Sequence, residues 1–70
     1  MIDNKELETR FTYHPPKGEQ VGMYEDIRDA AGLFSQFIIS NTPESREQSL
    51  AITKIEEAVY WANAAIARRS

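Results

Sequence analysis

Two segments of the sequence carry apolar residues at helical spacing. The first stripe, within residues 20–40, consists of Met23, Ile27, Ala30, Phe34 and Ile38. The second, within residues 43–69, consists of Ile52, Ile55, Val59, Ala62 and Ile66. Residues three or four positions apart lie on one face of a helix, so each segment is predicted to be an amphipathic helix.

The stretch between the two helices, "SNTPES", carries the signals of a turn followed by a helix start. Thr42 is the expected N-cap, and Pro43 stands at the first helical position, where its missing N–H group costs nothing. At about 1.5 Å per residue the helices are about 30 Å and 40 Å long. A short turn between them predicts an antiparallel two-helix hairpin.

The hairpin leaves more apolar surface than one internal seam can cover. The residues in surplus are Leu33, Phe37, Leu50, Tyr60 and Trp61. Large contiguous apolar patches rarely stay exposed. Either the N-terminal arm covers them or other subunits do, and we infer an oligomer.

The first 19 residues are predicted to form an arm. Residues 3–9 suit a short helix with Asp3 as N-cap and Glu6 as its capping-box partner. Residues 11–19 are predicted to be extended, because Pro15 and Pro16 remove two backbone donors and fix φ.

Composition narrows the class of protein. The chain has 70 residues, no cysteine, one histidine and a net charge of -3, which fits one all-α domain over residues 1–70. Disulfides and a zinc site are therefore not expected, and the acidic balance disfavours DNA. No signal peptide or membrane span is visible, so a cytoplasmic protein is expected.

Nothing in the pattern predicts catalysis, and we expect no enzyme, metal or cofactor. Binding is better supported, because Tyr13, His14 and Lys17 put two rings and a cation on a proline-stiffened arm. The competing interpretation is that Phe11 and Tyr13 pack the arm against the hairpin while Lys17 is solvated.

Arginines and one amide are further candidates. Arg28 lies between Glu25 and Asp29, so simple intrahelical ion pairs are an alternative to ligand binding. Arg46 follows the turn, and Arg68 lies where cations favour the end of a helix. Asn63 is locally unfavourable in mid-helix, which suggests a contact to a subunit or ligand.

Four motifs together resemble a phage family. They are "YHPPK", "YEDIRDAA", "SREQSLAITKIEEAV" and "WANAAIAR", within residues 11–69. The chain is similar to the helical hairpin domain of anti-CBASS and anti-Thoeris sponge proteins. The resemblance implies a hexamer that binds cyclic oligonucleotides of bacterial immunity in the host cytoplasm without cleaving them, with pockets between subunits.

The resemblance also gives the candidate residues roles. Tyr13 and His14 would meet a base, and Lys17 and Arg28 would meet phosphates. Arg46 and Arg68 would belong to a second pocket for a cyclic trinucleotide, with Thr53 and Asn63 as polar contacts. Anti-Thoeris members carry an additional N-terminal domain that these residues lack, which favours cyclic di- or trinucleotides over cyclic ADP-ribose isomers.

Three alternatives remain open at this point. The chain can be an oligomerisation or protein-interaction module with no nucleotide ligand. It can be a small nucleic-acid binder, although its net charge of -3 argues against that. It can also be an enzyme that degrades cyclic nucleotides.

Overall fold

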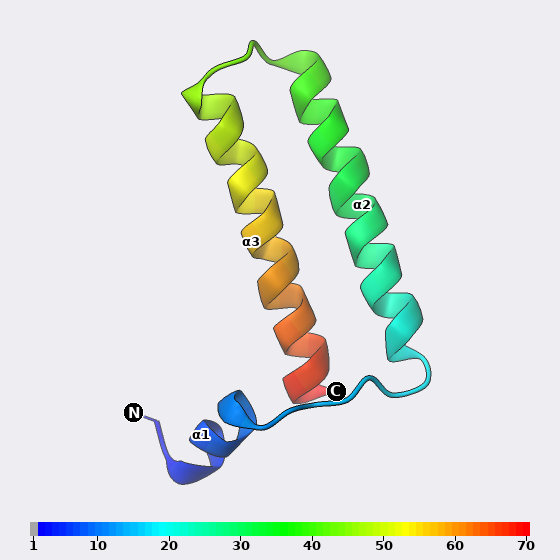
Figure 1. The fold of residues 1–70 in the computed structure, drawn as a ribbon, viewed down its shortest axis with the longest axis vertical. Helices are drawn as coiled ribbons and strands as arrows, with labels where there is room; N and C mark the ends of the chain where they lie inside the picture. Colours follow the sequence, from blue (N-terminus) through cyan, green and yellow to red (C-terminus); the bar gives the residue numbers. More distant parts are fainter. Residues whose placement is uncertain (1) are drawn as a thin grey trace.

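The computed structural model describes residues 2–70, which form three α-helices and no strand. They are α1 (Asn4–Phe11), α2 (Gln20–Asn41) and α3 (Arg46–Arg69). Figure 1 shows α2 and α3 running antiparallel as a hairpin, with α1 and the connecting arm across the end where α3 finishes. The prediction of an all-α hairpin with a short N-terminal helix and an arm is confirmed for the described residues.

Helix α1 begins at the predicted cap. An Asp3 side-chain oxygen accepts a hydrogen bond of 2.8 Å from the backbone N–H of Glu6. The helix runs to Phe11, two residues beyond the expected end at residue 9, so Phe11 is helical and not extended. The Glu6 carboxylate does not complete a capping box, because it pairs instead with Arg10 and Arg69.

The start of the long helix corrects our prediction. Helix α3 begins at Arg46 and not at residue 43, and its N-cap is Ser45, whose hydroxyl accepts a 3.1 Å hydrogen bond from the Gln48 N–H. The Thr42 hydroxyl does not cap α3, because it donates to the Ile38 carbonyl of α2 over 2.7 Å and accepts from the Gln48 side-chain amide over 3.1 Å. Thr42 therefore ends one helix and does not start the next.

The seam of α3 lies where the pattern predicted, whereas that of α2 is rotated. All five residues of the α3 stripe are half-buried. On α2 only Ile27 and Ile38 of the predicted stripe are half-buried, and Met23, Ala30 and Phe34 are exposed. The half-buried residues of α2 are instead Tyr24, Ile27, Ala31, Ser35 and Ile38. Small side chains therefore occupy much of the contact with α3.

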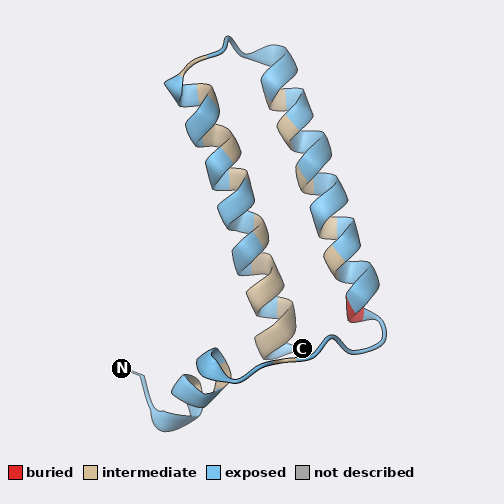
Figure 2. Cartoon of the chain, in the orientation of Figure 1, coloured by how far each residue is buried: buried red, intermediate tan, exposed pale blue. Residues whose placement is uncertain are grey.

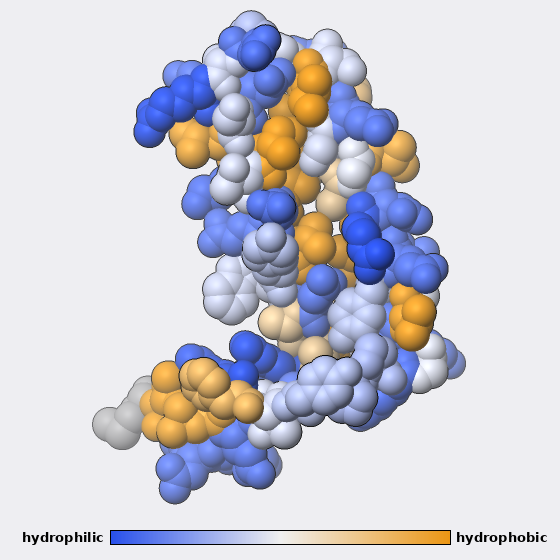
Figure 3. Space-filling view, viewed as in Figure 1, coloured by the Kyte–Doolittle hydropathy of each residue, from blue (hydrophilic) through white to orange (hydrophobic). Residues whose placement is uncertain are grey.

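The chain has no apolar core of its own. It measures 46 × 31 × 14 Å, so it is one helix thick, and no hydrophobic side chain among residues 2–70 is buried (Figure 2). Its accessible surface of 5786 Å² is roughly 30% more than a compact monomer of this mass exposes. Hydrophobic side chains lie open along the hairpin in Figure 3. The second layer that a domain normally needs is missing within one chain.

The five surplus apolar residues of the hairpin stay exposed, and the arm does not cover them. The arm's own rings are also uncovered, with Phe11 83% and Tyr13 80% exposed. Within the single chain these two rings therefore do not pack against the hairpin, contrary to the competing interpretation. Among residues 2–70, no helix combines the length and apolarity that crossing a membrane requires.

Candidate functional site

The arm is fastened to α1 by its histidine. The Nε2 atom of His14 lies 2.7 Å from the carbonyl oxygen of Thr9. A carbonyl oxygen only accepts, so Nε2 must carry the proton and donate it. Nδ1 is then the ring atom that stays free to accept a hydrogen bond when the ring is neutral. His14 therefore has a structural role that the sequence did not indicate, because it attaches the arm to α1.

The arm, α1, α2 and the end of α3 border an open hollow of about 420 Å³, here called the arm cavity. Its walls are Arg10, Thr12, Tyr13, His14, Tyr24, Asn63, Ala64, Ala67 and Arg68. Four of the eight predicted site residues therefore meet in one place: Tyr13, His14, Asn63 and Arg68. The volume lies within the range of about 300–1,000 Å³ typical of small-molecule sites.

Two features of the arm cavity suit a polar anionic ligand. Arg10 and Arg68 both line it, and the Arg68 Nη2 atom donates to the Arg10 carbonyl over 3.3 Å. The Oδ1 atom of Asn63 is buried and has no hydrogen-bond partner among the described residues. A buried polar atom without a partner is uncommon in folded proteins and is more often found at functional positions.

A second hollow, the arginine cleft, adjoins the first. It measures about 460 Å³ and is lined by Arg10, Phe11, Trp61, Ala64, Ala65, Arg68 and Arg69. Arg10, Ala64 and Arg68 belong to both hollows. Three guanidinium groups and two exposed rings thus gather at the end of α3, although the chain as a whole is acidic.

The Glu6 carboxylate forms ion pairs with two of these three arginines. It lies 2.8 Å from Arg69 Nη2 and 2.7 Å from Arg10 Nε. The hydrogen bonds from Arg69 and then Arg10 lower the pKa of Glu6 from 4.5 to about 2. The same contact raises the pKa of Arg69. Glu6 therefore neutralises part of the charge of Arg10 and Arg69, and it makes no ion pair with Arg68.

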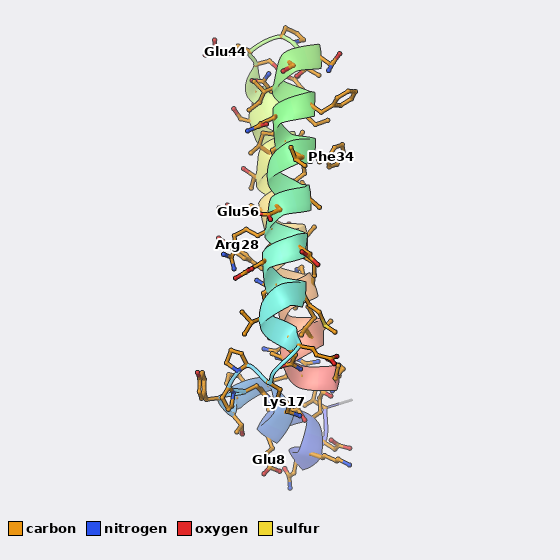
Figure 4. All side chains as sticks on the ribbon, turned by 90° about the vertical axis from the view of Figure 1, so that its right-hand side faces the viewer. Glu8, Lys17, Arg28, Phe34, Glu44 and Glu56 are labelled. Atoms are coloured by element: carbon orange, nitrogen blue, oxygen red, sulfur yellow. The ribbon has the colours of Figure 1, made fainter. Side chains whose placement is uncertain are left out.

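The other four predicted residues lie outside both hollows. Lys17 stands at the base of the hairpin and Arg28 farther along α2, where it lines a shallow hollow with Asp29, Gly32, Leu33 and Gln36 (Figure 4). Among the described residues Arg28 makes none of the ion pairs with Glu25 or Asp29 that its position allows.

Arg46 and Arg68 cannot share a pocket within one chain. They begin and nearly end the same helix, 22 residues and thus about 33 Å apart. Thr53 lies between them and is exposed. A pocket containing Arg46, Thr53 and Arg68 together therefore requires more than one subunit.

The sequence reasoning missed Arg10, Thr12 and Tyr24 as cavity residues. Tyr24 follows Gln20 by four positions and precedes Ile27 by three, so it carried the right helical spacing. It was overlooked because Met23 beside it fitted a more apolar stripe. Arg10 carried no signal, since it reaches the cavity only through the fold of the arm.

The fold and site define a small helical hairpin whose open end gathers cations and aromatic rings. The family described as Acb2/Tad1, hairpin domain, matches residues 3–67. The chain belongs to this family of anti-CBASS and anti-Thoeris sponge proteins, which bind cyclic oligonucleotides and are not known as enzymes. No curated protein and no solved structure matches the chain.

Proposed function

We propose that this chain binds cyclic di- or trinucleotide messengers of CBASS-type defence in the host cytoplasm and sequesters them without cleaving them. The observation that carries the proposal is the arm cavity, where Tyr13, His14, Asn63 and Arg68 converge beside Arg10. A ring can stack on a base, and a guanidinium group can pair with a phosphate.

The proposed binding unit is a symmetric homo-oligomer, a hexamer by resemblance to the family. The thin shape and the exposed large side chains support this, because a second subunit would supply the layer that one chain lacks. The arm cavity is open, so a neighbouring subunit would also supply a further wall. In such an assembly Lys17 and Arg28 would meet phosphates from positions that one chain keeps apart from the cavity.

The second proposed pocket lies near a symmetry axis and takes a cyclic trinucleotide. Arg46, Thr53 and Arg68 would come from different subunits there, because one helix holds Arg46 and Arg68 at its opposite ends. Repeated arginines around an axis repel one another, and a multivalent anion would relieve that repulsion.

Calorimetric titration with a panel of cyclic di- and trinucleotides tests the proposal. We expect tight binding, and chromatography after heat denaturation should recover the ligand intact. One ligand per two chains would indicate a site between two subunits, and one per three a threefold site. Recovery of cleaved ligand would indicate a degrading enzyme, and no binding across the panel would contradict the sponge.

The second candidate function is an oligomerisation or protein-interaction module without a nucleotide ligand. The exposed apolar side chains of the hairpin favour it, because they need a partner whatever the cavity binds. Under this alternative, Arg68→Ala leaves every small-molecule measurement unchanged. Under the sponge proposal it weakens binding.

A further inference from the structure

Gln20 is the one buried side chain among residues 2–70, with 7% of its surface exposed. It stands at the first position of α2, directly after the arm. Its Oε1 atom accepts a hydrogen bond of 2.9 Å from the Lys17 N–H. Its Nε2 atom donates to the Ile66 carbonyl of α3 over 3.3 Å and lies 3.5 Å from the Ser70 hydroxyl. We call this group of contacts the Gln20 clasp.

The orientation of the Gln20 amide is fixed by its partners. The Lys17 N–H can only donate, and the Ile66 carbonyl can only accept. Exchanging the oxygen and nitrogen of the amide would therefore break both contacts. The Gln20 N–H also donates to the Lys17 carbonyl over 2.7 Å, so Lys17 and Gln20 are joined by two hydrogen bonds.

The clasp connects three separate parts of the chain. Lys17 belongs to the arm, Gln20 to α2 and Ile66 to the last turn of α3. At its other end the arm is fastened by the bond between His14 and Thr9. Between these two anchors the arm has little burial to hold it, since Pro15 and Pro16 are both exposed. Directed polar contacts therefore fix the path of the arm where apolar packing does not.

Ile66 and Arg68 lie in the same turn of α3, and Asn63 lies one turn earlier. Tying Lys17 to that turn holds the arm across the face that carries Asn63 and Arg68. We propose that Gln20 is a positioning residue, which keeps Tyr13 and His14 opposite Asn63 and Arg68 so that the cavity is formed before the ligand arrives. The inference rests on the proposed function of that cavity.

Two substitutions separate the hydrogen bonds of Gln20 from its volume. Gln20→Met keeps the length of the side chain and removes all three of its polar contacts. Gln20→Glu keeps the acceptor for Lys17 but, when ionised, cannot donate to Ile66. Gln36→Met and Gln36→Glu are the matched controls, because Gln36 is an exposed glutamine on the same helix.

The first readout is the exchange rate of the Lys17 backbone amide, which needs no ligand. The Gln20 clasp protects this amide, so exchange in Gln20→Met should accelerate about 10-fold, the effect of losing one or two hydrogen bonds. The controls at Gln36 should leave it unchanged. Circular dichroism shows whether each variant keeps its helices.

The second readout is affinity for the cyclic nucleotide that the unmodified protein binds best. Apparent affinity falls with the fraction of molecules that hold the arm closed. We expect Gln20→Met to bind about 10-fold more weakly. The loss should appear without any change in the number of ligands bound per chain.

Gln20→Glu adds a rescue that a merely structural role would not produce. Burial and the facing Ile66 carbonyl raise the pKa of the introduced carboxyl group above its ordinary value. Once protonated, the group can again donate to Ile66 while accepting from Lys17. Affinity should therefore return as the pH falls through that pKa. The unmodified protein, measured over the same pH range, is the control and should show no such return.

The outcomes distinguish the two proposals. If the unmodified protein binds no cyclic nucleotide, the proposed function fails, while Lys17 exchange still reports whether Gln20 holds the arm. If Gln20→Met exchanges Lys17 rapidly but binds as tightly as the unmodified protein, the positioning role is overturned. Unchanged Lys17 exchange in Gln20→Met would overturn the clasp itself. If Gln20→Met loses its helices, the pH-dependent return in Gln20→Glu decides.

Discussion

Glu6 is a carboxyl group whose ionisation depends on the fold. Arg69 and Arg10 lower its pKa to about 2, whereas an unfolded chain would titrate near the ordinary 4.5. A lowered pKa means that the folded state binds the proton less readily than the unfolded state. The attachment of α1 to α3 is therefore complete above about pH 4.5 and lost as the pH falls toward 2.

We expect the carboxyl carbon of Glu6 to titrate with a midpoint near 2 in an NMR pH series. Glu8, on the same helix, is exposed and has no ion pair among the described residues, which makes it the internal comparison. In Glu6→Gln the neutral amide cannot pair with Arg69, so α1 should be less ordered at pH 7. A Glu6 midpoint in the ordinary range would show that the ion pairs do not form in solution.

Arg68 is the one predicted site residue that lines both hollows. Removing a charged hydrogen-bond donor to a ligand typically weakens binding by about 10- to 100-fold. Arg68→Ala should show a loss of this size in calorimetry. Lys54→Ala, which removes an exposed cation of the same helix outside both hollows, is the control. Equal losses in the two variants would indicate general electrostatic attraction and no specific contact.

The candidate residues show what local sequence can and cannot reveal. Tyr13, His14, Asn63 and Arg68 were chosen for their chemistry and family resemblance, and the fold brings them together. Arg10 was not foreseen, because its place depends on how α1 turns toward α3. The clasp was not foreseen either, because a glutamine at a helix start has no periodic signal. The pattern of residue types along the sequence does not reveal contacts between segments that are far apart in the chain.

The helices themselves were largely predictable, with two instructive errors. The α3 seam followed its heptad pattern because it faces a single partner helix. The α2 stripe was wrong in phase, because we assigned the largest side chains to the hairpin contact. Ala31 and Ser35 take that place instead, and Phe34 is 54% exposed. An apolar stripe indicates that a face is covered, but it does not say by which partner.

The start of α3 was the second error, and it supports a stability prediction. Ser45 caps the helix, so Ser45→Ala should lower the free energy of unfolding by about 1 kcal/mol. Thr42→Ala tests the competing assignment, because it removes a hydroxyl that bonds to α2 and to the Gln48 side chain but does not cap the start of α3. Urea unfolding of both variants gives the comparison. No loss in Ser45→Ala would favour a different start.

At the scale of the whole molecule, exposed apolar surface is the dominant feature. A chain 14 Å thick cannot bury a core, so assembly should contribute to its stability. We expect the midpoint of thermal unfolding to rise with protein concentration, as mass action requires for an oligomer. A midpoint that is independent of concentration, together with a monomeric mass in light scattering, would contradict assembly.

Two substitutions separate the inner and outer faces of the hairpin. Val59 lies in the half-buried seam of α3, so Val59→Asp should destabilise the hairpin by about 1–3 kcal/mol, because it places an unpaired charge in the contact with α2. Phe34 lies beside the seam and is 54% exposed, so Phe34→Asp should reduce the assembled mass while the helices persist. Gln36→Asp, exposed on the same helix, is the control for added charge. A fully assembled Phe34→Asp variant would place the subunit contact elsewhere.

The attachment of the arm has a thermodynamic consequence. Polar contacts of Glu6, His14 and Gln20 hold α1 and the arm against the hairpin. Release of α1 and the arm uncovers little apolar surface. Both the heat-capacity change of unfolding and the urea dependence of its free energy scale with newly exposed surface. Opening of the arm is therefore nearly invisible to calorimetric scans and urea titrations that report the melting of the hairpin. Ionic strength, which screens the pairing of Glu6 with Arg69, is the variable that reveals it.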